Sequence, residues 1–149
     1  MTLQNIHNSA IHTPDKIAVV IDGQSYSYAQ FYEMIYRTRE HLSTRNMPES
    51  GSVLIIMPSL LDAWLACFAA RSLGHSTLVV NAPSVTEGLD LRDIRAIITQ
   101  SAQQTAALAA YLGIAQYELP ELRVREKDIT RSGHEKMTLS GDHHLLTSG

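Results

Sequence analysis

The alternation of apolar and polar residues near the start of the chain predicts a β-hairpin. Residues 17–21 are all apolar, and residues 25–28 alternate serine with tyrosine. The dipeptide between the two runs, Asp-Gly at positions 22–23, tolerates the positive φ values of a two-residue hairpin turn. Gln24 belongs either to this turn or to the second strand.

An amphipathic helix is expected directly after the hairpin. Apolar residues recur every three or four positions from Tyr28 to Leu42. Ser27 precedes them, and Gln30 follows it by three residues, which is the spacing of a capping box. We expect this helix to end near the turn at residues 48–51.

Apolar strands then alternate with helical segments. The runs at residues 53–57, 77–80 and 94–99 are typical of strands covered on both faces, and we expect all three side by side in one sheet. Shorter strands are expected at residues 115–119, 122–124 and 143–146.

Helices are expected in two of the intervals between these strands. Ser59 can cap a largely buried helix that ends near Leu73, where Gly74 stops it. Ser101 and Gln104 repeat the capping spacing before an alanine-rich helix. Residues 84–93 are expected to form a loop, and residues 125–142 an exposed connector.

This order of elements predicts the fold class. Strands that alternate with helices form right-handed β-α-β units and a mostly parallel sheet. The protein is therefore expected to be α/β, with three layers, helices on both faces of the sheet and an N-terminal β-hairpin.

Composition indicates one globular domain over residues 1–149. The chain is 44% hydrophobic and 18% charged, with a formal net charge of -3, so it offers no basic surface for nucleic acid. No apolar run approaches the ~18 residues that span a bilayer, so no membrane partner is expected. With one cysteine and no secretory signal in residues 1–11, we expect a cytoplasmic protein.

The reactive side chains of the chain favour structural roles. Adjacent strand residues point to opposite faces of a sheet, so His143 and His144 do not easily share a metal ion, even with help from His134. No metal site is expected. Cys67 lies on an apolar helix face with no basic neighbour in sequence, and is interpreted as a buried, inert thiol.

Cofactor binding by the first strand and helix of the sheet is not predicted. Trp64 and Phe68 lie one helical turn apart and are interpreted as core residues. A dinucleotide-binding fold requires a glycine-rich turn after its first strand, whereas residues 58–61 are Pro-Ser-Leu-Leu. The dinucleotide fold is therefore excluded.

Four stretches, in this order, carry a family signal. Residues 12–19 are HTPDKIAV, residues 26–31 are YSYAQF, residues 71–83 are RSLGHSTLVVNAP and residues 145–149 are LLTSG. Together they resemble the AMP-forming acyl-CoA synthetases and nonribosomal-peptide adenylation domains. The last stretch is similar to the start of the phosphate-loop signature of that superfamily, and the chain resembles an N-terminal fragment cut off there.

The resemblance implies a site and an activity for the parent enzyme. Thr147, Ser148 and Gly149 would begin the loop that holds the phosphates of ATP, where hydroxyls and successive backbone N–H groups point at phosphate oxygens. The parent would use ATP and Mg²⁺ to convert a carboxylic acid to an acyl-adenylate. It would then pass the acyl group to a thiol, either CoA or carrier-protein phosphopantetheine.

The chain by itself is expected to differ from that parent. The later lysine, magnesium ligand and acid-binding pocket of the superfamily have no counterpart among these 149 residues. We therefore expect no cofactor and no catalysis for the fragment, and self-association through the surfaces it leaves open. The alternative is a free-standing α/β module that keeps the fold and binds a partner without catalysis.

Overall fold

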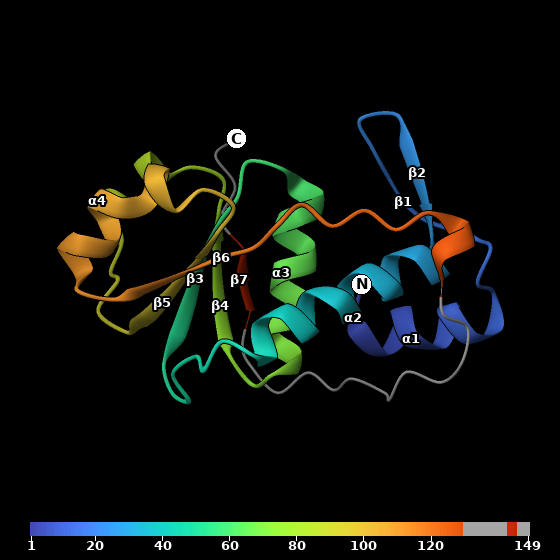
Figure 1. Ribbon diagram of the computed structural model, residues 1–149, viewed down its shortest axis with the longest axis horizontal. Helices are drawn as coiled ribbons and strands as arrows, with labels where there is room; N and C mark the ends of the chain where they lie inside the picture. The colour runs from blue at the N-terminus through green and yellow to red at the C-terminus, as the bar shows by residue number, and fades with distance from the viewer. Residues whose placement is uncertain (130–142, 146–149) are drawn as a thin grey trace.

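The computed structural model describes residues 1–129 and 143–145 (Figure 1). Its elements, in chain order, are α1 (Leu3–His12), β1 (Ile17–Ile21), β2 (Gln24–Ser27), α2 (Tyr28–Ser43), β3 (Ser52–Ile56), α3 (Leu60–Ser72), β4 (Ser76–Val80), η1 (Pro83–Thr86), β5 (Ile94–Thr99), α4 (Ala102–Leu112), β6 (Ala115–Glu118), η2 (Glu126–Asp128) and β7 (His143–Leu145). The α/β class is confirmed, and η1 forms a helical turn within the predicted loop.

Five strands form one parallel sheet, in the order β6-β5-β3-β4-β7. The three apolar runs predicted to lie side by side are β3, β4 and β5, so that prediction is confirmed. β1 and β2 form a separate antiparallel pair, as the hairpin pattern predicted.

Helices cover both faces of the parallel sheet, and two further helices extend one side (Figure 1). α3 packs on one face, where Val53 and Ile55 lie in the same cluster as Ala66 and Ala70. α4 and η1 cover the other face, which carries Leu54, Ile56 and Ile97. α2 packs on α3, and α1 packs on α2. The predicted three-layer arrangement is confirmed, with an additional layer of helices beyond α3.

The local signals at the hairpin turn and at the starts of α2 and α3 are confirmed. Asp22 and Gly23 have φ of 53° and 75°, and Gln24 belongs to β2. In the capping box, Ser27 Oγ accepts from the Gln30 backbone N–H at 3.1 Å, while Gln30 Oε1 accepts from the Ser27 N–H at 2.8 Å. Ser59 Oγ likewise accepts from the first turn of α3.

One helix was missed, and three expectations differ from the structure. The missed helix is α1, in which only Leu3 and Ile6 of ten residues are fully buried. α2 ends at Ser43, several residues before the turn at 48–51. Residues 122–124 form no strand, since they lie in an extended segment beyond the last sheet pairing of β6. The Ser101 side chain does not cap α4, for the reason given below.

Candidate functional site

The carboxyl edge of the parallel sheet contains a topological switch point between β3 and β5. The two strands are neighbours, yet the connection after β3 leads to β4 on one side and the connection after β5 leads to β6 on the other. Their helices, α3 and α4, lie on opposite faces of the sheet. Open α/β sheets bind ligands in the crevice at such a point, which makes this crevice the first candidate for a binding site.

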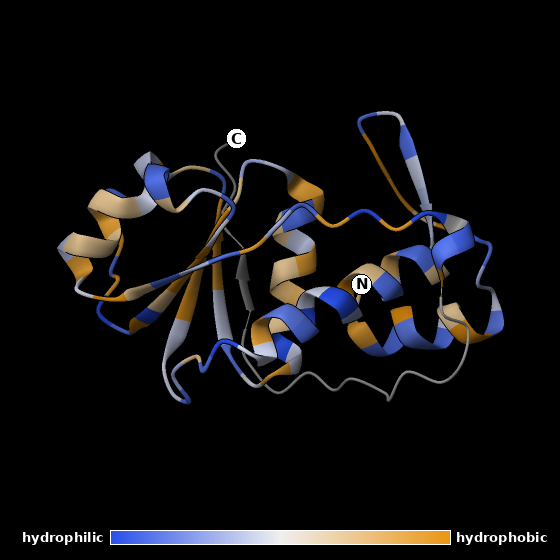
Figure 2. Ribbon diagram, in the orientation of Figure 1, coloured by the Kyte–Doolittle hydropathy of each residue, from blue (hydrophilic) through white to orange (hydrophobic). Residues whose placement is uncertain are grey.

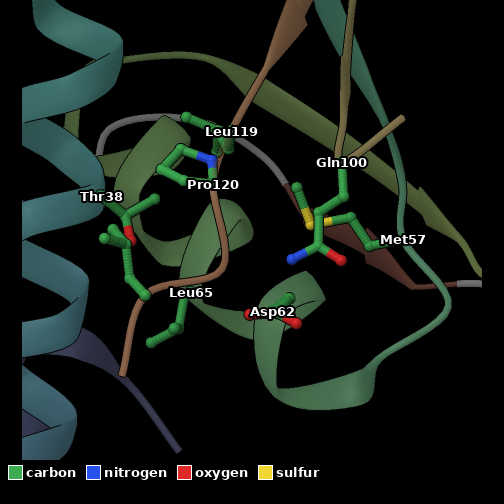
Figure 3. Close-up of a pocket in the computed structure, with 8 residues that line it drawn as sticks. Thr38, Met57, Asp62, Leu65, Gln100, Leu119 and Pro120 are labelled. Atoms are coloured by element: carbon green, nitrogen blue, oxygen red, sulfur yellow. The ribbon is translucent and has the colours of Figure 1, made fainter. Parts of the chain in front are cut away.

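Figure 3 shows the pocket found at this crevice. It is lined by Thr38, Met57, Asp62, Leu65, Gln100, Leu119, Pro120 and Leu122. The space open to a water molecule in it is about 10 Å³, no more than a single water requires. The crevice is therefore closed to a nucleotide in this conformation.

An extended segment after β6 closes the crevice. We call residues 119–124 the strap. The backbone N–H of Leu119 donates to the carbonyl of Thr99, at the end of β5, at 2.8 Å. Gln30 Nε2 of α2 donates to the carbonyl of Val124 at 3.0 Å. Leu119 and Val124 are both buried, so the strap is held at each end.

A two-pronged ion pair holds the middle of the strap. Arg123 donates from its two terminal guanidinium nitrogens to the two carboxylate oxygens of Asp62, at 2.7 and 3.2 Å. The Asp62 side chain is only 6% exposed and that of Arg123 31%. The bonds to Asp62 raise the pKa of Arg123. The Arg123 guanidinium thus holds the Asp62 carboxylate against the strap, and it also lies 3.4 Å from Glu121 Oε1.

The helix N-termini at the switch point are also occupied. An exposed helix N-terminus can bind a phosphate through its free N–H groups. In α3 the backbone N–H of Asp62 donates to Ser59 Oγ at 3.4 Å, and an acidic residue, Asp62, lies in the first turn. In α4 the backbone N–H of Ala102 donates to Glu118 Oε1 at 2.9 Å, and this carboxylate replaces the cap predicted for Ser101. Each terminus therefore already has one of its backbone N–H groups capped by a side chain.

The other side of the sheet leads to the predicted phosphate loop. β7 runs parallel to β4, with Val79 opposite Leu145, so β7 ends at the same carboxyl edge. Thr147, Ser148 and Gly149 follow Leu145 after one residue, and they lie outside the described residues, as does His134. The described structure therefore gives the direction of the strand before the loop and nothing of the loop itself.

Cys67, Phe68 and Trp64 have the buried, structural surroundings expected of them. Cys67 is buried, with its Sγ 3.6 Å from Thr77 Oγ1, and burial raises the pKa of its thiol. Phe68 packs edge-on against Phe31 with ring centroids 6.1 Å apart, and Trp64 packs against the same cluster.

Among residues 1–129 and 143–145, no three His, Cys, Asp or Glu side chains gather as metal ligands would. No described helix has the length and apolar character to cross a membrane.

Sequence reasoning missed the residues that shape this edge. Asp62 and Arg123 are 61 positions apart, and Ala102 and Glu118 are 16 apart. No short motif links either pair. Nothing in the sequence pattern identified Arg123 as the partner of Asp62.

Comparisons with known proteins agree with the resemblance. Residues 6–141 match the family described as AMP-binding enzyme. No curated protein sequence matches the chain.

Solved structures with a similar fold are adenylate-forming enzymes. o-Succinylbenzoate CoA synthetase (MenE) from Bacillus subtilis, in complex with ATP and magnesium ion, is 16% identical with a TM-score of 0.62, over 80% of this chain and 35% of that chain. A double mutant of the same enzyme with the product analogue OSB-NCoA is 15% identical with a TM-score of 0.62. The match covers 85% of this chain and 27% of that chain. NpsA-ThdA, an artificially fused adenylation-PCP di-domain from Klebsiella oxytoca, is 17% identical with a TM-score of 0.58. The match covers 68% of this chain and 20% of that chain.

The chain thus spans between 20% and 35% of the length of these three structures. At these identities the likeness shows the fold, while the family match extends over most of the sequence. The chain belongs to the AMP-binding enzyme family and has part of the adenylate-forming fold.

Proposed function

We propose that this chain is part of an ATP-dependent ligase that activates a carboxylic acid and transfers it to a thiol. In such a reaction a carboxylate oxygen attacks the α-phosphorus of ATP, pyrophosphate leaves, and a thiol then displaces AMP from the acyl-adenylate. The family match is the first support. The MenE structures, one with ATP and magnesium ion and one with a CoA product analogue, are the second. The adenylation domain fused to a PCP makes a carrier-protein thiol the other possible acceptor.

One structural observation carries the proposal to particular residues. β7 lies beside β4 in parallel and ends at the carboxyl edge, where ligands of α/β sheets bind. Thr147, Ser148 and Gly149 follow the end of β7 after one residue, Leu146. The switch-point crevice does not fit a nucleotide, and its two helix N-termini are already capped. These observations support our proposal that the segment after β7 binds phosphate, since its hydroxyls and backbone N–H groups suit phosphate oxygens.

The described residues act as a scaffold in this proposal. The strap closes the crevice at the carboxyl ends of β3 and β5, and the ion pair of the buried Asp62 with the partly exposed Arg123 keeps it closed. The nucleotide is thereby directed to the β4–β7 side of the edge. The magnesium ligand, the adenine pocket and the acid pocket would come from other parts of the parent enzyme.

The 149-residue chain alone should bind ATP poorly. About three backbone N–H groups at residues 147–149 contribute roughly 1.5–3 kcal/mol each when well placed. Association costs at least ~4 kcal/mol, and ordering a chain segment costs about 1–2 kcal/mol per residue. Because the two sides nearly cancel, calorimetric titration with magnesium-ATP should give a dissociation constant in the millimolar range or weaker. A micromolar value would contradict this reasoning.

The complete product of the gene tests the proposal itself. Its affinity for magnesium-ATP should be at least tenfold lower in a Ser148→Ala variant, which loses a hydroxyl contact worth roughly 1.5 kcal/mol or more. Gly149→Ala should also weaken binding, because the added methyl group restricts the backbone and its approach to the phosphates. Ser101→Ala is the matched control, because its hydroxyl lies at the same edge and does not cap α4. Pyrophosphate exchange with a panel of carboxylic acids then identifies the substrate. A complete product that neither binds magnesium-ATP nor exchanges pyrophosphate would favour the non-catalytic module instead.

A further inference from the structure

The β1–β2 hairpin has an open edge. Its two strands form a sheet of their own, separate from the parallel sheet, and Figure 1 shows the hairpin projecting away from the helices. Within the described residues, β1 pairs with β2 on one edge and with no strand on the other. A two-stranded sheet is only marginally stable, and an unpaired strand edge is a template for another strand.

The side chains of β1 make this edge attractive to a partner. All five residues, Ile17–Ile21, are apolar, and four of them are β-branched. Figure 2 shows this strand in orange beside the paler β2. Ile17 is 52% exposed and Val20 61%. Soluble proteins usually protect an edge with lysine, proline or a bulge. β1 carries only the irregularity between Ile17 and Val19.

The charges at the two ends of β1 are complementary. Lys16 precedes the strand and Asp22 follows it, both are exposed, and neither forms an ion pair with any other described side chain. If two copies of β1 pair antiparallel about Val19, Lys16 of each copy lies opposite Asp22 of the other. Opposite charges across an antiparallel pair stabilise it, and like charges destabilise it. A parallel pairing would instead place the two lysines together.

We propose that β1 pairs antiparallel with β1 of a second copy of this chain, which joins two hairpins into one four-stranded sheet. The contact is a two-fold interface in which the same strand serves both copies. This proposal assigns the expected self-association of the chain to β1. It does not depend on the ATP-dependent activity proposed above. Because a five-residue edge is smaller than a standard interface, the dimer should be weak and should dissociate on dilution.

Sedimentation equilibrium of the 149-residue chain measures this dimer. The wild-type chain should dimerise, and Val20→Lys should abolish the dimer by placing a charge on the apolar edge. Tyr111→Ser is the control, because Tyr111 is 87% exposed in α4 and lies outside the hairpin. Circular dichroism checks that each variant is folded.

A charge exchange tests the register. Lys16→Glu and Asp22→Lys should each weaken self-association roughly tenfold, because each replaces two attractive pairs with repulsive ones. An equimolar mixture of the two variants should form a heterodimer of near wild-type affinity. In that heterodimer the glutamate introduced in one copy faces the lysine introduced in the other, while the unchanged Lys16 faces the unchanged Asp22 in the second pair.

Several results would overturn the proposal. A wild-type chain that stays monomeric at about 1 mM is one. A dimer that survives Val20→Lys, or that is lost in Tyr111→Ser, would place the interface elsewhere. Failure of the mixed variants to associate would contradict the antiparallel register. A monomer whose β1 amides resist hydrogen exchange on both edges would show that another segment of the same chain covers the strand.

Discussion

Replacing Arg123 with methionine tests how the strap is held. Methionine keeps much of the length and apolar stem of the side chain, but it leaves the Asp62 carboxylate, 6% exposed, without its cation. Breaking a fully buried ion pair costs about 3–5 kcal/mol, and a surface pair contributes about 0.2–1 kcal/mol. Because the Arg123 side chain is 31% exposed, water offsets part of the loss, and we expect a decrease of about 2–3 kcal/mol in the free energy of unfolding.

Urea unfolding monitored by fluorescence measures the effect. The chain has one tryptophan, Trp64, in the same helix as Asp62. With an m-value of about 1–3 kcal/mol per molar urea, the transition midpoint should fall by roughly 1–2 M. Arg125→Met is the matched control. The Arg125 side chain is 73% exposed and pairs with Asp128 on the surface, so its replacement should change stability by less than about 0.5 kcal/mol.

A double-mutant cycle isolates the interaction. Asp62→Asn removes the charge and keeps the shape, so adding it to Arg123→Met should recover part of the lost stability. The coupling energy between the two sites should be at least about 1 kcal/mol. If Arg123→Met behaves like Arg125→Met, or if the effects of the two substitutions simply add, the pair does not hold the strap and our account of the closed crevice is wrong.

Three further outcomes follow from the titratable groups. Burial raises the pKa of the Cys67 thiol, so a thiol reagent at about pH 8 should react with the native chain at least ~100-fold more slowly than with the chain in urea. Burial lowers the pKa of His75 from its ordinary 6.5, so its ring should titrate below that value by NMR. Because the unfolded chain then binds more protons, stability should fall as the pH drops through 6.5, and His75→Gln should reduce this loss. Glu118→Gln should cost about 0.5–1 kcal/mol by weakening the N-terminus of α4, whereas Glu121→Gln, whose carboxylate is 67% exposed, should cost less than about 0.5 kcal/mol.

Features that depend on neighbours in the sequence were predictable. The hairpin turn requires residues that accept positive φ, and Asp22 and Gly23 are two of them. The capping box requires only Ser27 and Gln30, three positions apart. The three central strands, β3, β4 and β5, are largely apolar because both of their faces are covered, and that pattern is visible without the fold.

The candidate site could not be predicted in the same way. The crevice between β3 and β5 is closed by a strap that follows β6, and the ion pair that holds it joins residues 61 positions apart. The cap of α4 comes from Glu118, across 16 positions, in place of the nearby Ser101. Each of these contacts exists only once the strands have taken their order in the sheet.

What the sequence by itself determined is therefore the set of elements, the fold class and the family resemblance. Local backbone preferences and the period of apolar residues are sufficient for the first two. Tertiary packing decided three other properties. They are the closing of the crevice at the carboxyl ends of β3 and β5, the capping of the α4 N-terminus by Glu118 and the unpaired edge of β1. Those properties depend on which elements meet in space, and a polar side chain such as Asp62 has the same local sequence whether or not an arginine closes over it.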